Sequence, residues 1–125
     1  MNILPLIGAT LILLLGGVHS YLGERYILIR LFRRADLPHL FGSDVFTKRT
    51  LRFAWHLTTV AWLGLGVFFI IIAAPTQVLR RSEIGAVLAA TAGVSAVVTL
   101  VGSRGRHLAW VVFVAVAAAA WLGSR

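Results

Sequence analysis

Four long apolar runs constrain this chain more than any other feature. They cover about residues 3–22, 53–74, 84–101 and 108–122, and polar or charged segments separate them. Each run is close to the ~20 residues that an α-helix needs to cross the hydrocarbon core of a bilayer. The connections after the first are short, which favours antiparallel neighbours. We therefore expect an all-α fold, a single integral membrane domain over residues 1–125 that forms a four-helix antiparallel bundle.

The composition indicates a lipid environment. Hydrophobic residues make up 59% of the 125 positions, and charged residues only 13%. One soluble core of this size could not bury so much apolar surface, whereas lipid can cover the surplus. The chain has no cysteine. This excludes disulfides, thiolate metal ligands, thiol nucleophiles and covalent attachment of a c-type haem.

The chain has a formal net charge of +8, and the distribution of its basic residues indicates the expected topology. Basic residues beside hydrophobic spans fix orientation and meet anionic lipid headgroups, so we expect membrane lipids and no nucleic acid as partners. The positive-inside rule places segments 23–52 and 102–107 in the cytoplasm and both termini outside, in a bacterial inner membrane. The two segments carry Arg25, Arg30, Arg33, Arg34, Lys48, Arg49, Arg52, Arg104 and Arg106, against Arg80, Arg81 and Arg125 on the other side.

The first apolar run and the long connection after it are both interpreted as retained structure. The run starts without basic residues and lacks an A-x-A cleavage site, so it is a helix and not a signal peptide. Residues 25–34 keep a helical period, which predicts a cytoplasmic interfacial helix or a projection of the first helix. A proline then ends this segment. We expect Ser43 or Asp44 to cap a helix beginning at about Val45, and Ser82 to cap the third helix.

The histidines gather at one end of the predicted helices. His19 lies near the end of the first span, His56 near the start of the second, and His107 just before the fourth. Antiparallel threading brings them to the cytoplasmic face at similar depth, together with Glu24. A polar group inside a span is costly to bury, so it usually faces the bundle interior and has a partner.

Spacing groups further polar side chains on the second helix. Arg49, Arg52 and His56 follow i, i+3 and i+7, which is one stripe, and Thr59 continues it. Because this stripe begins in the headgroup region and runs into the span, we expect it to face the polar end of the first helix.

The polar side chains near the end of the first helix point in two directions. Ser20 and Glu24 are four residues apart and share a face. His19 and Glu24 are five apart, so about 140° separates them on a regular helix. They could not bind one ion from an unbroken helix, although Gly23 could loosen the turn between them.

The preferred functional prediction is a histidine-based metal or haem site at the cytoplasmic interface, possibly redox active. Two or three imidazoles with a carboxylate form a common ligand set for Zn, Fe or Cu. For haem b, the two facing histidines would be the axial pair. The predicted metal ligands are His19, His56, His107 and Glu24; the cofactor-binding residues are His19, His56, Arg49 and Arg52, with Gly16 and Gly64 making room for a ring.

Two other interpretations stay open. Arginines and histidines around an apolar mouth suit a lipid phosphate or a quinone headgroup, with an imidazole and Glu24 exchanging protons. Ser20 is a candidate nucleophile only by adjacency. Alternatively the chain is a non-catalytic accessory subunit of a larger complex, whose histidines hydrogen-bond across helices. Gly85, Ala89 and Gly93 form a small-residue face for a homo-oligomer or for packing within the bundle.

Two stretches carry a family resemblance. His19-Ser-Tyr-Leu-Gly-Glu-Arg25 and Arg52-Phe-Ala-Trp-His-Leu-Thr58 resemble stretches of small, uncharacterised bacterial membrane proteins with four predicted spans. The resemblance covers about the first half of the chain. It implies a four-span fold and groups these two stretches together, but it implies no activity.

Overall fold

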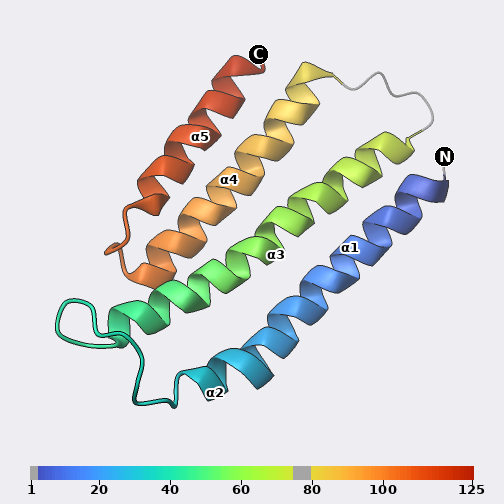
Figure 1. The fold of residues 1–125 in the computed structure, drawn as a ribbon. Helices are drawn as coiled ribbons and strands as arrows, with labels where there is room; N and C mark the ends of the chain where they lie inside the picture. The colour runs from blue at the N-terminus through green and yellow to red at the C-terminus, as the bar shows by residue number, and fades with distance from the viewer. Residues whose placement is uncertain (1–2, 75–79) are drawn as a thin grey trace.

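The first helix is longer than its apolar run. The computed structural model describes residues 3–74 and 80–125. Within them, α1 (Ile3–Leu22) continues through the π-helical turn η1 (Gly23–Leu28) into the short α2 (Ile29–Leu31). The basic segment after the first span is therefore an extension of that span. Of the two predicted forms, a separate interfacial helix and a projection of the first helix, the second is found (Figure 1).

Three further helices run back and forth beside the first. α3 (Val45–Ala73) packs against the first helix, α4 (Arg81–Ser103) against α3, and α5 (Ala109–Gly123) against α4. Backbone contacts among the described helices join only such consecutive neighbours, so the helices lie in an antiparallel row (Figure 1). This confirms the predicted all-α, antiparallel four-helix fold. The start of α1 and the end of α5 lie at one end; the other, which carries α2 and the first turns of α3, we call the basic end.

The helices differ in length relative to a bilayer. The continuous helix Ile3–Leu31 and α3 each have 29 residues, and α4 has 23; all three are long and apolar enough to cross a membrane. These helices identify the chain as a membrane protein. α5 has 15 residues, or about 22 Å at ~1.5 Å per residue, which is less than a ~30 Å hydrocarbon core. That α5 also crosses stays a prediction.

Two of the predicted helix caps are wrong. α3 begins at Val45 as expected, but its N-cap Asp44 makes no side-chain cap hydrogen bond, because its carboxylate pairs with Lys48 one turn later. α4 is capped by Arg80 and not by Ser82. The Arg80 backbone N–H donates to Oε2 of Glu83 at 3.2 Å, which is half of a capping box and fixes the helix start earlier.

The acidic side chains in the exposed connection between α2 and α3 form ion pairs. Arg34 donates to both carboxylate oxygens of Asp36, at 2.8 and 2.6 Å. This hydrogen bonding lowers the pKa of Asp36. The hydrogen bond from Lys48 likewise lowers the pKa of Asp44. Both carboxylates therefore remain charged at neutral pH, and neither belongs to the polar contacts between the long helices.

The π-helical turn has an identifiable cause in the packing of α1 on α3. A side chain at Gly23 would overlap the indole of Trp55. The indole N–H of Trp55 donates to the carbonyl oxygen of His19 at 3.2 Å, which is the acceptor that a regular α-helix assigns to the N–H of Gly23. Competition for this carbonyl and the close approach of a large ring both favour a wider turn, and such turns are frequent at functional sites.

Some of the small residues of α4 pack against the end of α5, and others do not. A side chain at Gly85 would overlap Ser124 beyond the end of α5, whereas Gly93 has open space around it. Ala92 and Ala96 are buried on the same helix. Gly85 thus packs within the chain. A role for the face formed by Gly85, Ala89 and Gly93 in binding a second copy or a larger complex stays a prediction.

Candidate functional site

A polar cluster joins α1 to α3 at the basic end. A hydrogen bond of 2.9 Å links Oγ of Ser20 to Nδ1 of His56, and another of 2.8 Å links Ser20 to Oγ1 of Thr59. Ser20 therefore fills the space between two α3 side chains that are three residues apart. These contacts are part-buried between the helices, and they satisfy the hydrogen-bonding groups of the hydroxyl and the imidazole.

Glu24 completes this cluster from the π-helical turn. Its Oε1 lies 3.0 Å from Nη2 of Arg52, and its Oε2 lies 3.5 Å from Nε2 of His56. The Oε2 atom is buried and accepts no hydrogen bond within the described part of the chain. Because a carboxylate only accepts, a neutral His56 facing it carries its proton on Nε2 and accepts the Ser20 hydroxyl at Nδ1.

Arg52 and Arg49 differ in how they are held. The guanidinium of Arg52 pairs with Glu24 and also lies over the ring of Phe32, 5.0 Å from its centroid. Arg49 has no ion pair within residues 3–74 and 80–125. The polar end of α3 therefore offers one positioned arginine and one that pairs with no carboxylate of the described residues.

His19 belongs to a separate aromatic cluster. Its ring stacks on Trp55 with centroids 4.5 Å apart and meets the edge of Trp62 at 4.8 Å. Its Nε2 is 2.9 Å from Oγ1 of Thr58, whose hydroxyl donates to the Trp55 carbonyl. Since a hydroxyl has one proton to give, Nε2 of His19 is the donor in this contact. A donating nitrogen has no lone pair free for a metal.

His107 lies elsewhere again. Its ring packs between Phe46, with centroids 6.1 Å apart, and Phe53, at 5.3 Å. Its Nδ1 accepts the backbone N–H of Ala109 at 3.2 Å. His107 thereby satisfies one of the free backbone N–H groups at the start of α5.

The predicted convergence of three imidazoles is therefore not found. His56 and Glu24 do meet, but no group of three histidine or acidic side chains that could hold a metal ion exists among residues 3–74 and 80–125. The reason is rotational: His19 is one residue from Ser20, about 100° around the helix. With Ser20 facing His56, His19 faces the aromatic side. The room expected beside Gly64 for a haem is also filled, by Thr91 of α4.

A pocket of about 490 Å³ lies on the other side of His56, between α3 and α4. Its polar wall comes from α3 and its apolar wall from α4. The lining residues are Arg49, Arg52, Phe53 and His56, opposite Val97, Val98, Val101 and Gly102. Ser20 does not line it. The predicted stripe of Arg49, Arg52 and His56 thus faces a cavity, with His56 between this cavity and the cluster on α1.

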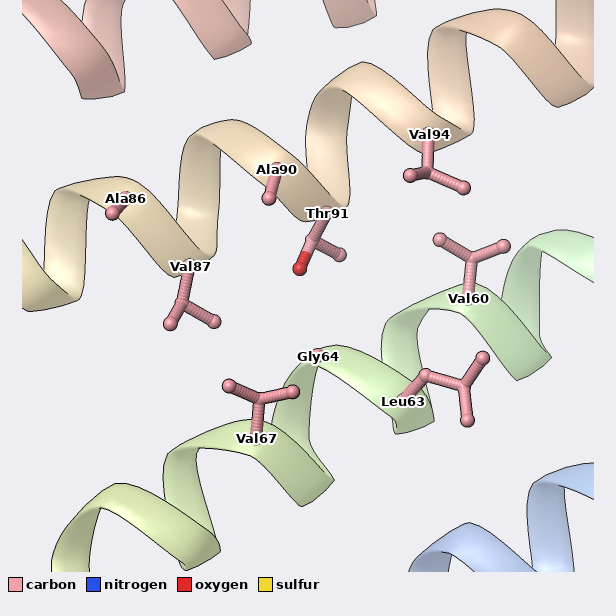
Figure 2. A pocket seen from close by; sticks show the side chains of 9 residues that line it. All are labelled: Val60, Leu63, Gly64, Val67, Ala86, Val87, Ala90, Thr91 and Val94. Atoms are coloured by element: carbon pink, nitrogen blue, oxygen red, sulfur yellow. The ribbon is translucent and has the colours of Figure 1, made fainter.

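A second pocket, of about 350 Å³, lies between the same two helices, farther from the basic end. Figure 2 shows its side chains between α3 and α4, with Val60 and Val94 pointing toward each other and Val67 facing Val87 across the gap. Gly64 and Thr91 meet in its middle. Positions 49, 53, 56, 60, 64 and 67 recur every three or four residues, so both pockets lie on one side of α3.

The α4 wall is the part of this site that sequence reasoning missed. Val97, Val98 and Val101 look like ordinary span residues, and nothing in their type marks a binding surface. A signal did exist: positions 87, 90, 94, 97 and 101 recur at helical spacing opposite the basic stripe of α3. That signal becomes informative only once α3 and α4 are known to be adjacent.

No protein-family model matches the chain, and neither a similar curated protein nor a similar solved structure was found.

Proposed function

We propose that this protein binds an anionic membrane amphiphile, with a phosphate headgroup at Arg49 and Arg52 and its apolar chain between α3 and α4. In this proposal the basic end lies at the cytoplasmic face of a bacterial inner membrane, with both termini outside. The observation that carries it is the pocket whose α3 wall is basic and whose α4 wall is valine.

The two walls suit the two parts of such a ligand. Guanidinium groups bind phosphate oxygens through charge-assisted hydrogen bonds, often two at once. Basic groups near an anionic leaflet attract it by about 1 kcal/mol each. The second pocket, lined by valine, leucine and alanine side chains with Gly64 and Thr91, offers the adjoining acyl chain a largely apolar surface. A headgroup without a chain would leave that surface unused.

The geometry favours this function over the metal or haem site predicted from the sequence. Only His56 and Glu24 of the predicted ligands approach each other, at 3.5 Å. The rings of His19 and His107 each contact two aromatic rings of α3, one stacked and one at a steep angle. Arg49, in contrast, is a cation without an acidic partner among the described residues, and it faces a cavity.

The first prediction concerns Arg49→Gln. Losing one charged hydrogen-bonding partner of a phosphate costs roughly 1.5–3 kcal/mol, so we expect roughly ten- to hundredfold weaker binding of phosphatidylglycerol. Binding of the zwitterionic phosphatidylcholine should not change. Native mass spectrometry of the full chain in detergent, titrated with each lipid, gives both affinities.

Arg81→Gln is the matched control, because it removes the same charge at the start of α4, at the other end of the helices. It should leave phosphatidylglycerol binding within about twofold of the unmodified protein. Equal losses in the two variants would mean that net charge alone attracts the lipid, and would refute the proposed site.

A further inference from the structure

We infer that Glu24 sets the charge class of the ligand, so that the pocket prefers a singly charged phosphodiester to a doubly charged phosphomonoester. The inference rests on the proposed function and adds the headgroup class to it. Its starting point is the carboxylate that holds Arg52 from behind the pocket.

The charged side chains around the pocket balance one negative charge on a ligand. Arg49 and Arg52 are cations, and the Glu24 carboxylate, 3.0 Å from Arg52, offsets one of them. The facing wall of α4 contributes valines and Gly102, none of which is charged. The side chains of Arg49, Arg52 and Glu24 thus sum to a net charge of +1. A phosphodiester carries a single negative charge, whereas a phosphomonoester carries about 1.5 to 2 near pH 7.

Glu24 lies close enough to the pocket for its negative charge to affect a bound ligand. The guanidinium of Arg52 has five N–H donors in a planar fork, so it can hold Glu24 and still donate to a phosphate. The second Glu24 oxygen is buried, accepts no hydrogen bond within the described chain, and lies 3.5 Å from the His56 ring that lines the pocket. An additional ligand charge would lie across one imidazole from this oxygen, and the two negative charges would repel each other.

The second prediction is therefore a preference in the unmodified protein. At pH 8, where a phosphomonoester is doubly charged, phosphatidylglycerol should bind more tightly than phosphatidic acid with the same acyl chains. Arg52 is half-exposed, its side chain 51% accessible, so the preference should be modest, roughly three- to fivefold. Equal binding, or tighter binding of phosphatidic acid, would overturn the inference without any variant.

Glu24→Gln tests the cause of that preference. It keeps an oxygen near Arg52 but raises the charge of the site by one, so the ratio of the two affinities should shift toward phosphatidic acid by a similar factor. Ser20→Ala is the control, because it removes a partner of His56 without changing the charge. Helical circular dichroism verifies that each variant is folded.

The outcomes separate this inference from the proposed function. If Arg49→Gln weakens both lipids but Glu24→Gln leaves their ratio unchanged, lipid binding stands and the role of Glu24 is wrong. If Arg49→Gln weakens neither lipid, the proposed function itself fails. If Ser20→Ala shifts the ratio as much as Glu24→Gln, the preference depends on the orientation of His56 and not on the charge of Glu24.

Discussion

Gly23 and Trp55 together determine the local geometry on which the polar contacts of α1 depend. The indole occupies the space where a side chain at position 23 would lie, and its N–H takes the carbonyl of His19. The chain therefore widens into the π-helical turn that carries Glu24 toward Arg52. A glycine is required here for close approach, since the turn itself has ordinary right-handed backbone angles at its start.

The third prediction follows from this contact. Gly23→Ala should destabilise the protein by about 1–3 kcal/mol, because the added methyl group forces the indole to move. The midpoint of thermal unfolding in detergent measures the effect. Gly17→Ala is the control on the same helix, since nothing lies within 4 Å of a side chain there. Equal effects of the two substitutions would contradict the close contact between Gly23 and Trp55.

Both pockets lie between α3 and α4, and the packing of these two helices depends on a glycine of α3 opposite a threonine of α4. Gly64 of α3 lets Thr91 of α4 approach so closely that any side chain at position 64 would overlap it. Close approach at one point, with valines on either side of it, keeps the two helices adjacent (Figure 2). Such small-residue contacts are a common basis of helix association in membranes.

A fourth prediction tests this contact. Gly64→Ala should lower stability by about 1–3 kcal/mol through overpacking, and adding Thr91→Ala should recover much of the loss by returning the space. Thermal unfolding of the single and double variants checks the size of the recovery. Gly93→Ala provides the control, because that position has open surroundings and alanine favours a helix. Additive losses in the double variant would contradict the proposed contact.

As a whole, the molecule is a row of helices with large apolar side chains on its outer surfaces. Leu11 of α1 and Val112 of α5, for example, are 63% and 62% exposed, and even Val97 and Val101, which line the pocket beside His56, are 59% and 69% exposed. Water could not cover such a surface favourably, whereas acyl chains can. A ligand chain between α3 and α4 would therefore be continuous with surrounding lipid, and only its headgroup would be bound by specific polar groups.

The fifth prediction concerns the acyl chain of the ligand. A soluble glycerophosphodiester should compete with phosphatidylglycerol only at concentrations at least about a hundredfold higher, because each buried methylene of a lipid chain contributes ~0.8 kcal/mol. Competition titrations in detergent test this. Equal competition would identify a site for a free phosphate ester in place of a membrane lipid.

The candidate site was predictable in part. The spacing of Arg49, Arg52 and His56 predicted one stripe, and the four-residue spacing of Ser20 and Glu24 predicted one face. Both sets meet at His56. The positions of His19 and His107 were not predictable, because similar depth in a membrane says nothing about rotation around a helix. Their partners are aromatic rings from α3, which no spacing rule connects to them.

The sequence alone determined that this chain forms long helices suited to a membrane, since the length of an apolar run and the absence of charge within it are properties of single segments. It also placed most of the basic residues at one end. Only the tertiary structure decided which polar groups meet and that α4 supplies the apolar wall of the pocket. Those contacts depend on how each helix is rotated against its neighbour, and a packed glycine, an indole and a widened turn set that rotation between α1 and α3.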